Sequence, residues 1–167
     1  MIWRWVLGLV LVAGVGVSGV AQAGGAGSQQ GQERRDEAFR MVDAYVIANL
    51  QESLGLDDAT YEKAIPLVNK LQKARREFFQ ERLRTQRKMR HLLRSGTATE
   101  VQVQETLDAF KALEVEGPER IRQHMDELDA LLTPLQQAKY RVFEVEVEHR
   151  MRELMRRGRR ERSPKPE

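Results

Sequence analysis

The chain contains no cysteine among its 167 residues. No disulfide can therefore cross-link the fold, no thiolate can act as a nucleophile, and no lipid can be attached through a cysteine. Aromatic residues make up only 6% of the chain, and glycine is scarce after residue 31. The alternation that a strand needs occurs only briefly, at 101–103 and 145–147. This composition predicts an all-α protein.

Recognisable catalytic motifs are also missing. The sequence has no nucleophile elbow, no glycine-rich phosphate loop and no H-E-x-x-H pair. Three of its five serines, at 28, 95 and 163, fall in an expected linker, a helix end and a tail. Carboxylates are numerous, but on a charged helical chain they belong to solvated faces. We therefore expect a protein that is not an enzyme and needs no cofactor.

The first residues carry the three parts of a secretory signal. Arg4 precedes an apolar run over 5–20, which ends in the small-x-small sequence 21–23. The run is shorter than the ~20 residues that cross a bilayer. We expect a cleaved signal peptide over 1–23, a periplasmic location and no membrane span after cleavage; an uncleaved anchor facing the same compartment is the alternative. A flexible Gly/Gln/Ser linker is predicted over 24–32.

Charge is balanced, with 28 Lys and Arg against 25 Asp and Glu and a net charge of +3. The basic stretch 150–162 and the basic second helix are the features that a nucleic acid could contact. Because the chain is expected to be exported and its basic residues are balanced by glutamates, we predict no nucleic-acid partner. The C-terminal stretch could instead contact anionic lipid or a sensor domain.

Two helices are predicted in the first half of the helical domain, which we place at 33–158. The first covers 33–54 and ends at Gly55. The second runs from the N-cap Asp57 to Arg94, with Leu56 and Tyr61 placed as a hydrophobic staple. Pro66 is expected to kink it. At 1.5 Å per residue this helix is about 55 Å long, too long for a compact monomer of this size. We therefore expect an elongated protomer and a homodimer.

Two more helices are predicted in the second half. The third begins at Thr97 or Thr99 and is expected to break at 117–118, because a residue before proline avoids the α region. The fourth has a clear start, with Thr133 as N-cap and Gln136 completing a capping box. It carries two apolar stripes, which predict burial against two neighbours: Phe143, Val147, Met151 and Leu154 form one, and Leu135, Val142 and Val145 form the other. A basic disordered tail is expected over 159–167.

The starts of the second and fourth helices carry related motifs. Leu132, Thr133 and Gln136 give Leu-Thr-x-x-Gln. Leu54-Gly-Leu56-Asp57 begins a second, partial copy, with Asp57 in place of threonine and Thr60 in place of glutamine. With the signal peptide and the long charged hairpin between them, these motifs resemble the Spy/CpxP, or LTXXQ-motif, family and its metal-sensing relatives of the CnrX and ZraP kind. The resemblance implies a four-helix protomer whose long kinked hairpins pair antiparallel into a curved dimer.

The resemblance also implies a function. Members act as ATP-independent chaperones or as sensors and dampers of envelope stress, so we expect the chain to bind unfolded or stress-sensing partner proteins. The alternative is a heavy-metal-responsive sensor that regulates a membrane partner. Each histidine has a methionine nearby, as in His91 with Met89. Since neighbours one or two positions apart point in different directions on a helix, we predict no metal site.

One stripe of the second helix is the candidate binding surface. Its members are spaced three or four residues apart: Arg76, Phe79, Leu83, Arg87, Arg90 and Arg94. It is offset by about a quarter turn from the predicted core face of Leu67, Leu71, Phe78, Met89 and Leu92. Apolar groups ringed by arginine can hold acidic or unfolded segments. The sequence leaves open whether Phe79 and Leu83 instead form the dimer seam, with the arginines as its solvated rim.

Overall fold

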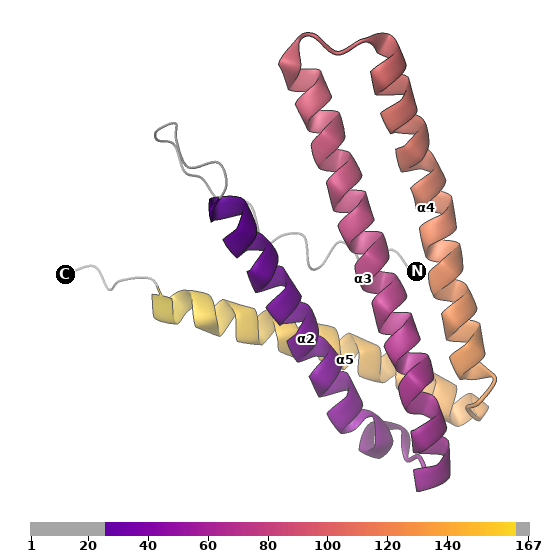
Figure 1. Cartoon of the computed structure of the whole chain (residues 1–167). Coiled ribbons are helices and arrows are strands. Elements are labelled where there is room, and N and C mark those ends of the chain that lie inside the picture. The colour runs from indigo at the N-terminus through magenta and orange to yellow at the C-terminus, as the bar shows by residue number, and fades with distance from the viewer. Residues whose placement is uncertain (1–25, 163–167) are drawn as a thin grey trace. The chain divides into compact units, whose positions relative to one another are not determined.

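The computed structural model describes residues 26–162, and its elements are four α-helices: α2 (Ala26–Leu54), α3 (Asp58–Ser95), α4 (Glu100–Asp129) and α5 (Pro134–Arg162) (Figure 1). No strand occurs within these residues, so the all-α, four-helix prediction is confirmed. The expected signal peptide and residues 163–167 of the expected tail lie outside the described part. The chain divides into two compact units, one made by 59–133 and the other by the segments before and after it.

In the unit formed by α2 and α5, the two helices contact each other and cross (Figure 1). Their contact face follows the helical repeat, because side chains three or four positions apart share one side of a helix. The buried side chains of α2 are Val46, Leu50 and Leu54, and those of α5 include Tyr140, Phe143, Val147 and Met151. The first apolar stripe predicted for α5 is therefore buried as far as Met151; the side chain of Leu154 lies outside the described ones.

The C-terminus of α2 is closed by a left-handed glycine. Gly55 has φ +68°, and the N–H groups of Gly55 and Leu56 donate to carbonyls in the last turn of the helix at 3.2 and 3.0 Å. This is the glycine-dependent cap expected from the sequence. Lys139 Nζ of α5 donates to the carbonyl of Leu54 at 3.3 Å. The cap thus ties the end of α2 to its partner helix.

Both outer boundaries of the helical region differ from the sequence prediction. The linker predicted over 24–32 is wrong from Ala26 onward, because α2 begins there. The tail predicted over 159–167 is wrong up to Arg162, where α5 ends. In both segments a helix already formed needs only to propagate, and the glutamines and arginines there are good helix formers. The glycines in these segments do not prevent a helix, because each costs it only about 1 kcal/mol.

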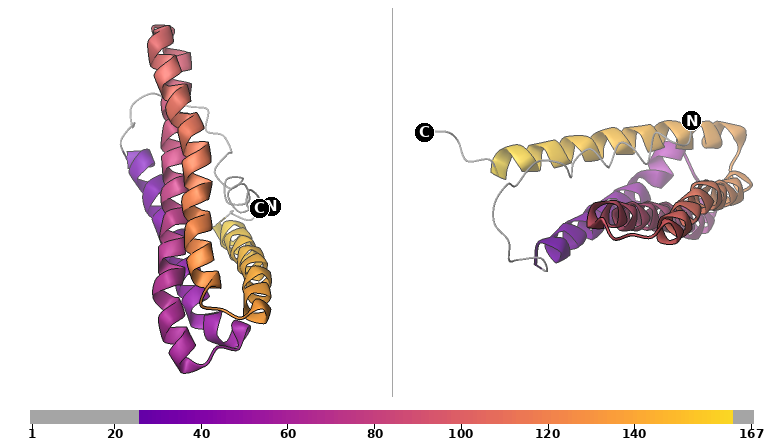
Figure 2. Two further views of the ribbon diagram at one scale, coloured as in Figure 1. Left: turned by 90° about the vertical axis from the view of Figure 1, so that its right-hand side faces the viewer. Right: turned by 90° about the horizontal axis from the view of Figure 1, so that it is seen from above.

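In the other unit, α3 and α4 lie side by side as an antiparallel hairpin (Figures 1 and 2). The 38 residues of α3 extend over about 57 Å, and the helix continues through Pro66. Gly96, with φ +65°, follows its end. Thr99 then caps α4: its side chain accepts from the N–H of Gln102 at 3.3 Å, and the Gln102 side chain accepts from the N–H of Thr99 at 3.0 Å. The sequence predicts either Thr97 or Thr99 as the N-cap of this helix, and the capping box identifies Thr99.

The predicted break at 117–118 is wrong, since α4 runs unbroken from Glu100 to Asp129 with Pro118 inside it. The steric rule against a helical residue before proline arises partly from that residue's Cβ. Gly117 has none, so it can remain helical. Pro118 has no N–H to donate. One backbone carbonyl in the preceding turn of α4 therefore lacks its usual helical hydrogen bond.

The fourth predicted helix begins where expected. α5 starts at Pro134, directly after Thr133. The second apolar stripe of this helix does not behave as predicted, because Leu135, Val142 and Val145 are exposed in the protomer. The sequence pattern predicted that both apolar stripes of α5 pack against other helices. Within one protomer only the first stripe is buried.

Candidate functional site

Three contacts set the register of α3 against α4. The Phe78 ring lies against Gly117, Arg82 pairs with Glu114 at 3.3 Å, and an exposed pair joins Lys70 to Glu127 at 4.0 Å. As the contacting residue moves toward the C-terminus of α3, its partner moves toward the N-terminus of α4, as in an antiparallel pair. These contacts define the side of α3 that faces α4, and the candidate stripe lies on a different side.

Arg82 is the polar element of this packing. Its side chain is only 18% exposed, and its guanidinium lies 5.4 Å from the centre of the Phe110 ring. A guanidinium at this distance from an aromatic face that also pairs with a carboxylate combines a cation–π contact with an ion pair. The contact of Arg82 with Phe110 and Glu114 was not predicted from the sequence. The available signal was an arginine on the same helical face as the predicted core residues Phe78 and Met89.

The candidate binding stripe divides into two parts along α3. Arg76, Phe79 and Leu83, nearer the middle of the helix, are half-buried. Arg87, Arg90 and Arg94, near the tip of the hairpin, are exposed. The structure therefore places the apolar members where they are partly covered and the basic members in solvent.

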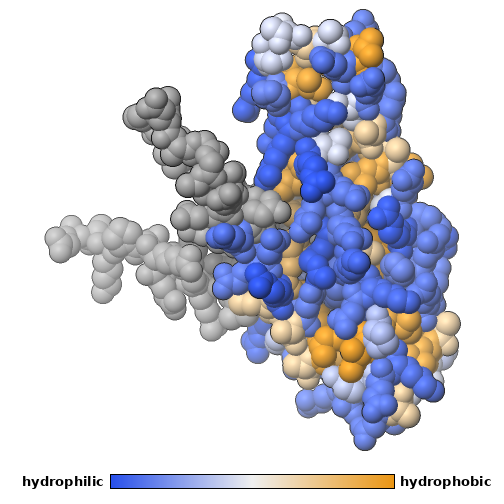
Figure 3. All heavy atoms as spheres, in the orientation of Figure 1, coloured by the Kyte–Doolittle hydropathy of each residue, from blue (hydrophilic) through white to orange (hydrophobic). Residues whose placement is uncertain are grey.

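The tip of the hairpin is basic and also exposes apolar side chains. No acidic residue occurs between Glu81 and Glu100, while six Lys and Arg residues fall in that interval. Leu93 of α3 is 67% exposed and Val101 of α4 is 66% exposed. Hydrophilic and hydrophobic atoms are accordingly mixed at this end of the hairpin (Figure 3). Such a surface can attract an acidic segment by charge and hold it by apolar contact.

The three histidines lie on different helices: His91 on α3, His124 on α4 and His149 on α5. His91 and His149 are both exposed. His124 Nδ1 lies 3.4 Å from a carboxylate oxygen of Glu127. Within residues 26–162 no three His, Cys, Asp or Glu side chains come together as a metal ion would need.

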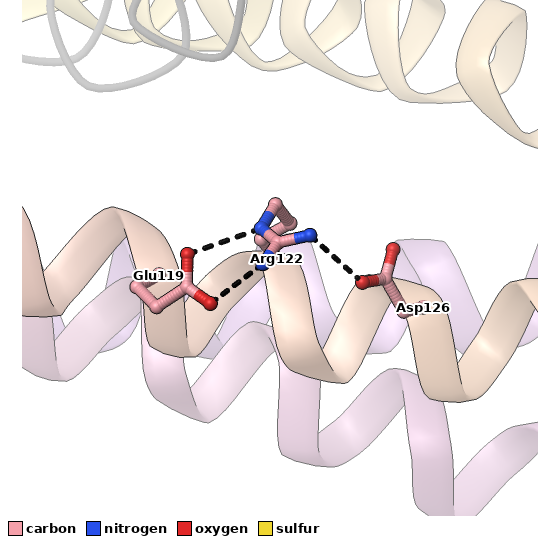
Figure 4. Close-up of polar contacts among 3 residues, drawn as sticks. All are labelled: Glu119, Arg122 and Asp126. Atoms are coloured by element: carbon pink, nitrogen blue, oxygen red, sulfur yellow. Dashed lines mark hydrogen bonds and ion pairs between the residues drawn. The ribbon is translucent and has the colours of Figure 1, made fainter.

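A charged network occupies the outer side of α4. Arg122 pairs with Glu119 at 2.7 Å and with Asp126 at 3.4 Å (Figure 4). The hydrogen bonds from Arg122 hold the pKa of the Glu119 carboxyl below its ordinary value, and the same pairing raises the pKa of Arg122. All three side chains are about half exposed, so this is a helix-stabilising surface network rather than a site.

The motif residues lie at the starts of α3 and α5. Leu56 and Leu132 are buried, each at 6% exposure, whereas Asp57 and Thr133 are exposed and Gln136 is half-buried. Each motif thus combines a buried leucine with a polar residue just before the helix. This arrangement fits helix capping, the role that the sequence predicts for these residues.

Comparison with protein-family models, curated proteins and solved structures gives no match for this chain. The resemblance to the Spy/CpxP family that the sequence motifs suggest therefore stays a prediction. Among the helices of the described part, none is both long and apolar enough to cross a membrane.

Proposed function

We propose that this chain is an exported, non-enzymatic helical protein of the Spy/CpxP kind. In this proposal it binds unfolded or stress-sensing partner proteins in the periplasm as an ATP-independent chaperone or envelope-stress modulator. One observation carries the proposal: the distal half of α3 exposes Arg87, Arg90 and Arg94 in a stretch without acidic residues. The exposed Leu93 and Val101 at the same end supply apolar surface.

The physical basis is weak, adaptable binding. Arginine side chains attract acidic segments and stack on aromatic rings, and their long stems cover apolar surface. The half-buried Phe79 and Leu83 continue the same stripe toward the middle of the helix. Such a surface binds through long, flexible side chains along one helix, so many unfolded segments can bind it.

The test is a pair of charge reversals. Arg87→Glu with Arg90→Glu should weaken the suppression of client aggregation, because the new carboxylates repel acidic segments. The matched control is Arg84→Glu with Lys88→Glu, which makes the same change of net charge at two other exposed positions of α3. We expect the control to retain most of the activity.

Salt provides a second criterion. Exposed charges are screened beyond about 8–10 Å at physiological ionic strength, so the difference between the double variant and the wild-type protein should shrink as salt is added. Full anti-aggregation activity in the Arg87/Arg90 variant contradicts the proposed role of these arginines. An equal loss in the Arg84/Lys88 control would show that overall charge matters and the stripe does not.

A heavy-metal-responsive sensor that regulates a membrane partner is the alternative function. It would need metal ligands from more than one helix, because each of α3, α4 and α5 carries a single histidine. A stoichiometric, histidine-dependent metal site found by isothermal titration calorimetry would favour the sensor.

A further inference from the structure

The outer face of α5 carries an apolar stripe that the protomer leaves in solvent. Leu135 is 67% exposed, Val142 is 59% exposed and Val145 is 48% exposed. On a helical wheel they lie on the side opposite the buried Tyr140 and Phe143, which face the core. These three residues are therefore not part of the α2–α5 contact.

The stripe has the spacing of a coiled-coil seam. Counting from Leu135, alternate steps of three and four residues give Leu135, Ala138, Val142, Val145, His149 and Arg152. Ala138, His149 and Arg152 are exposed as well. A strict heptad of this kind presents a narrow stripe to one partner helix, unlike the broader face of a helix packed on a globular core. We propose that this seam pairs with the same seam of a second copy of the chain, with the two α5 helices antiparallel.

The charges beside the seam select the antiparallel arrangement. In such a pair, Val142 of one copy lies across from Val145 of the other, and Ala138 lies across from His149, a small residue against a large one. Lys139 then lies opposite Glu146 of the second copy. By the twofold symmetry of the pair, each of these contacts occurs twice.

The other flank of the seam is also complementary in this register. Arg141 of one copy lies opposite Glu148 of the other, so both flanks bring together unlike charges. Charged residues flanking a seam set the orientation and register of coiled coils. Lys139 can keep its bond to the Leu54 carbonyl, because an ammonium has three donors, and Glu148 also has Arg152 of its own helix beside it.

Neighbouring registers are disfavoured by the same residues. A shift by one heptad in one direction brings Lys139 opposite Lys139 and Arg141 opposite Arg141. The opposite shift brings together two copies of Glu146 and two of Glu148. A parallel pair would place Arg141 against Glu146, but it would also place Glu148 against Glu153 and stack the two copies of His149, so it has fewer favourable charge contacts than the antiparallel pair. Like charges across a helix interface are unfavourable, so one antiparallel register is selected.

The first test is the concentration dependence of sedimentation for the purified protein. We expect a monomer–dimer equilibrium, weakened on the order of tenfold or more by Val142→Glu, because a carboxylate would be buried in the seam. The matched control is Val115→Glu. Val115 of α4 is 71% exposed and lies off the seam, so its variant should sediment like the wild-type protein. Helix content by circular dichroism should be unchanged in both.

The second test uses complementary charge variants. Lys139→Glu alone places glutamate against Glu146, and Glu146→Lys alone places lysine against Lys139, so each variant should self-associate less than wild type. A one-to-one mixture restores opposite charges in every Lys139–Glu146 position and should dimerise again. Because Lys139 also caps α2, recovery in the mixture distinguishes a lost interface from a lost fold.

Three results would overturn the proposal. A protein that stays monomeric at high concentration has no second copy on this face. A dimer that survives Val142→Glu uses another surface, such as the Phe79–Leu83 part of α3. Failure of the mixture to recover, with both variants folded, contradicts the antiparallel register. The proposal is independent of client binding, so aggregation assays do not bear on it.

Discussion

The ring of Phe78 in α3 lies against the backbone of α4 at Gly117. A Cβ atom at Gly117 would stand 2.1 Å from Cδ2 of that ring and 2.6 Å from Cε2. Real contacts of this kind are never so short, and Phe78 is only 2% exposed. The ring therefore fills the space that the missing side chain leaves, and the two helices of the hairpin approach closely at this point.

Gly117→Ala is predicted to destabilise the protein although alanine is the better helix former. The alanine gains about 1 kcal/mol in helix propensity, but the enclosed ring has little room to move aside. Overpacking a tight contact costs about 1–3 kcal/mol, and here the clash is with the buried ring of Phe78 on the facing helix α3. We expect a net loss in the free energy of unfolding, measured by chemical denaturation.

The double variant is the control for this prediction. Phe78→Ala alone should cost about 3–5 kcal/mol because it opens a cavity. Adding Gly117→Ala to it should cost little or even stabilise, since the clash is gone and the propensity gain remains. A strictly additive double variant would mean that the two positions do not contact each other.

This contact also explains which part of the fold the sequence could predict. Capping residues act within a few positions of their helix, so the start of α5 after Thr133 could be predicted directly and the start of α4 could be narrowed to Thr97 or Thr99. The packing of Phe78 against Gly117 could not be predicted, because the two residues are distant in the sequence. Local rules alone predicted a break there.

The candidate site was predictable to a similar extent. Helical spacing placed the six residues of the α3 stripe on one side, but spacing does not determine burial. The partial cover over Phe79 and Leu83 depends on the packing around α3. Likewise, the pattern of α5 indicated two apolar stripes correctly, but it could not show that the chain itself covers only one.

The caps offer a second prediction. Thr99→Ala should lower the free energy of unfolding by about 1 kcal/mol, because the N–H of Gln102 loses its side-chain acceptor. Thr133→Ala should cost a similar amount at the start of α5. Thr97→Ala is the matched control: Thr97 is an exposed threonine two residues before the α4 cap, and its loss should change stability by less than about 0.5 kcal/mol. An unchanged denaturation midpoint for Thr133→Ala would mean that it does not cap α5.

The third prediction concerns metal binding. Because the histidines lie singly on three helices, we expect no zinc, nickel or copper binding tighter than roughly micromolar. Isothermal titration calorimetry on the purified protein measures this directly. A stoichiometric site that disappears on His124→Ala or His91→Ala would instead support the metal-responsive sensor.

The last prediction uses two neighbouring phenylalanines with different environments. Phe78 is buried, whereas Phe79 is half-buried on the candidate stripe. If the stripe binds clients, Phe79→Ala should reduce the suppression of client aggregation. Its cost in stability should stay well below that of Phe78→Ala, because a partly exposed ring loses less apolar contact.

The competing role for Phe79 is a dimer seam on α3, and the same variant distinguishes it. In that case Phe79→Ala would open a cavity between two copies, cost about 3–5 kcal/mol and dissociate the dimer in sedimentation. The proposed seam on α5 predicts that Phe79→Ala leaves the oligomeric state unchanged. Aggregation suppression, stability and oligomeric state measured on this one variant therefore separate a client-binding ring from an interface ring. Dissociation by Phe79→Ala would refute both the client-binding role of that ring and the α5 seam.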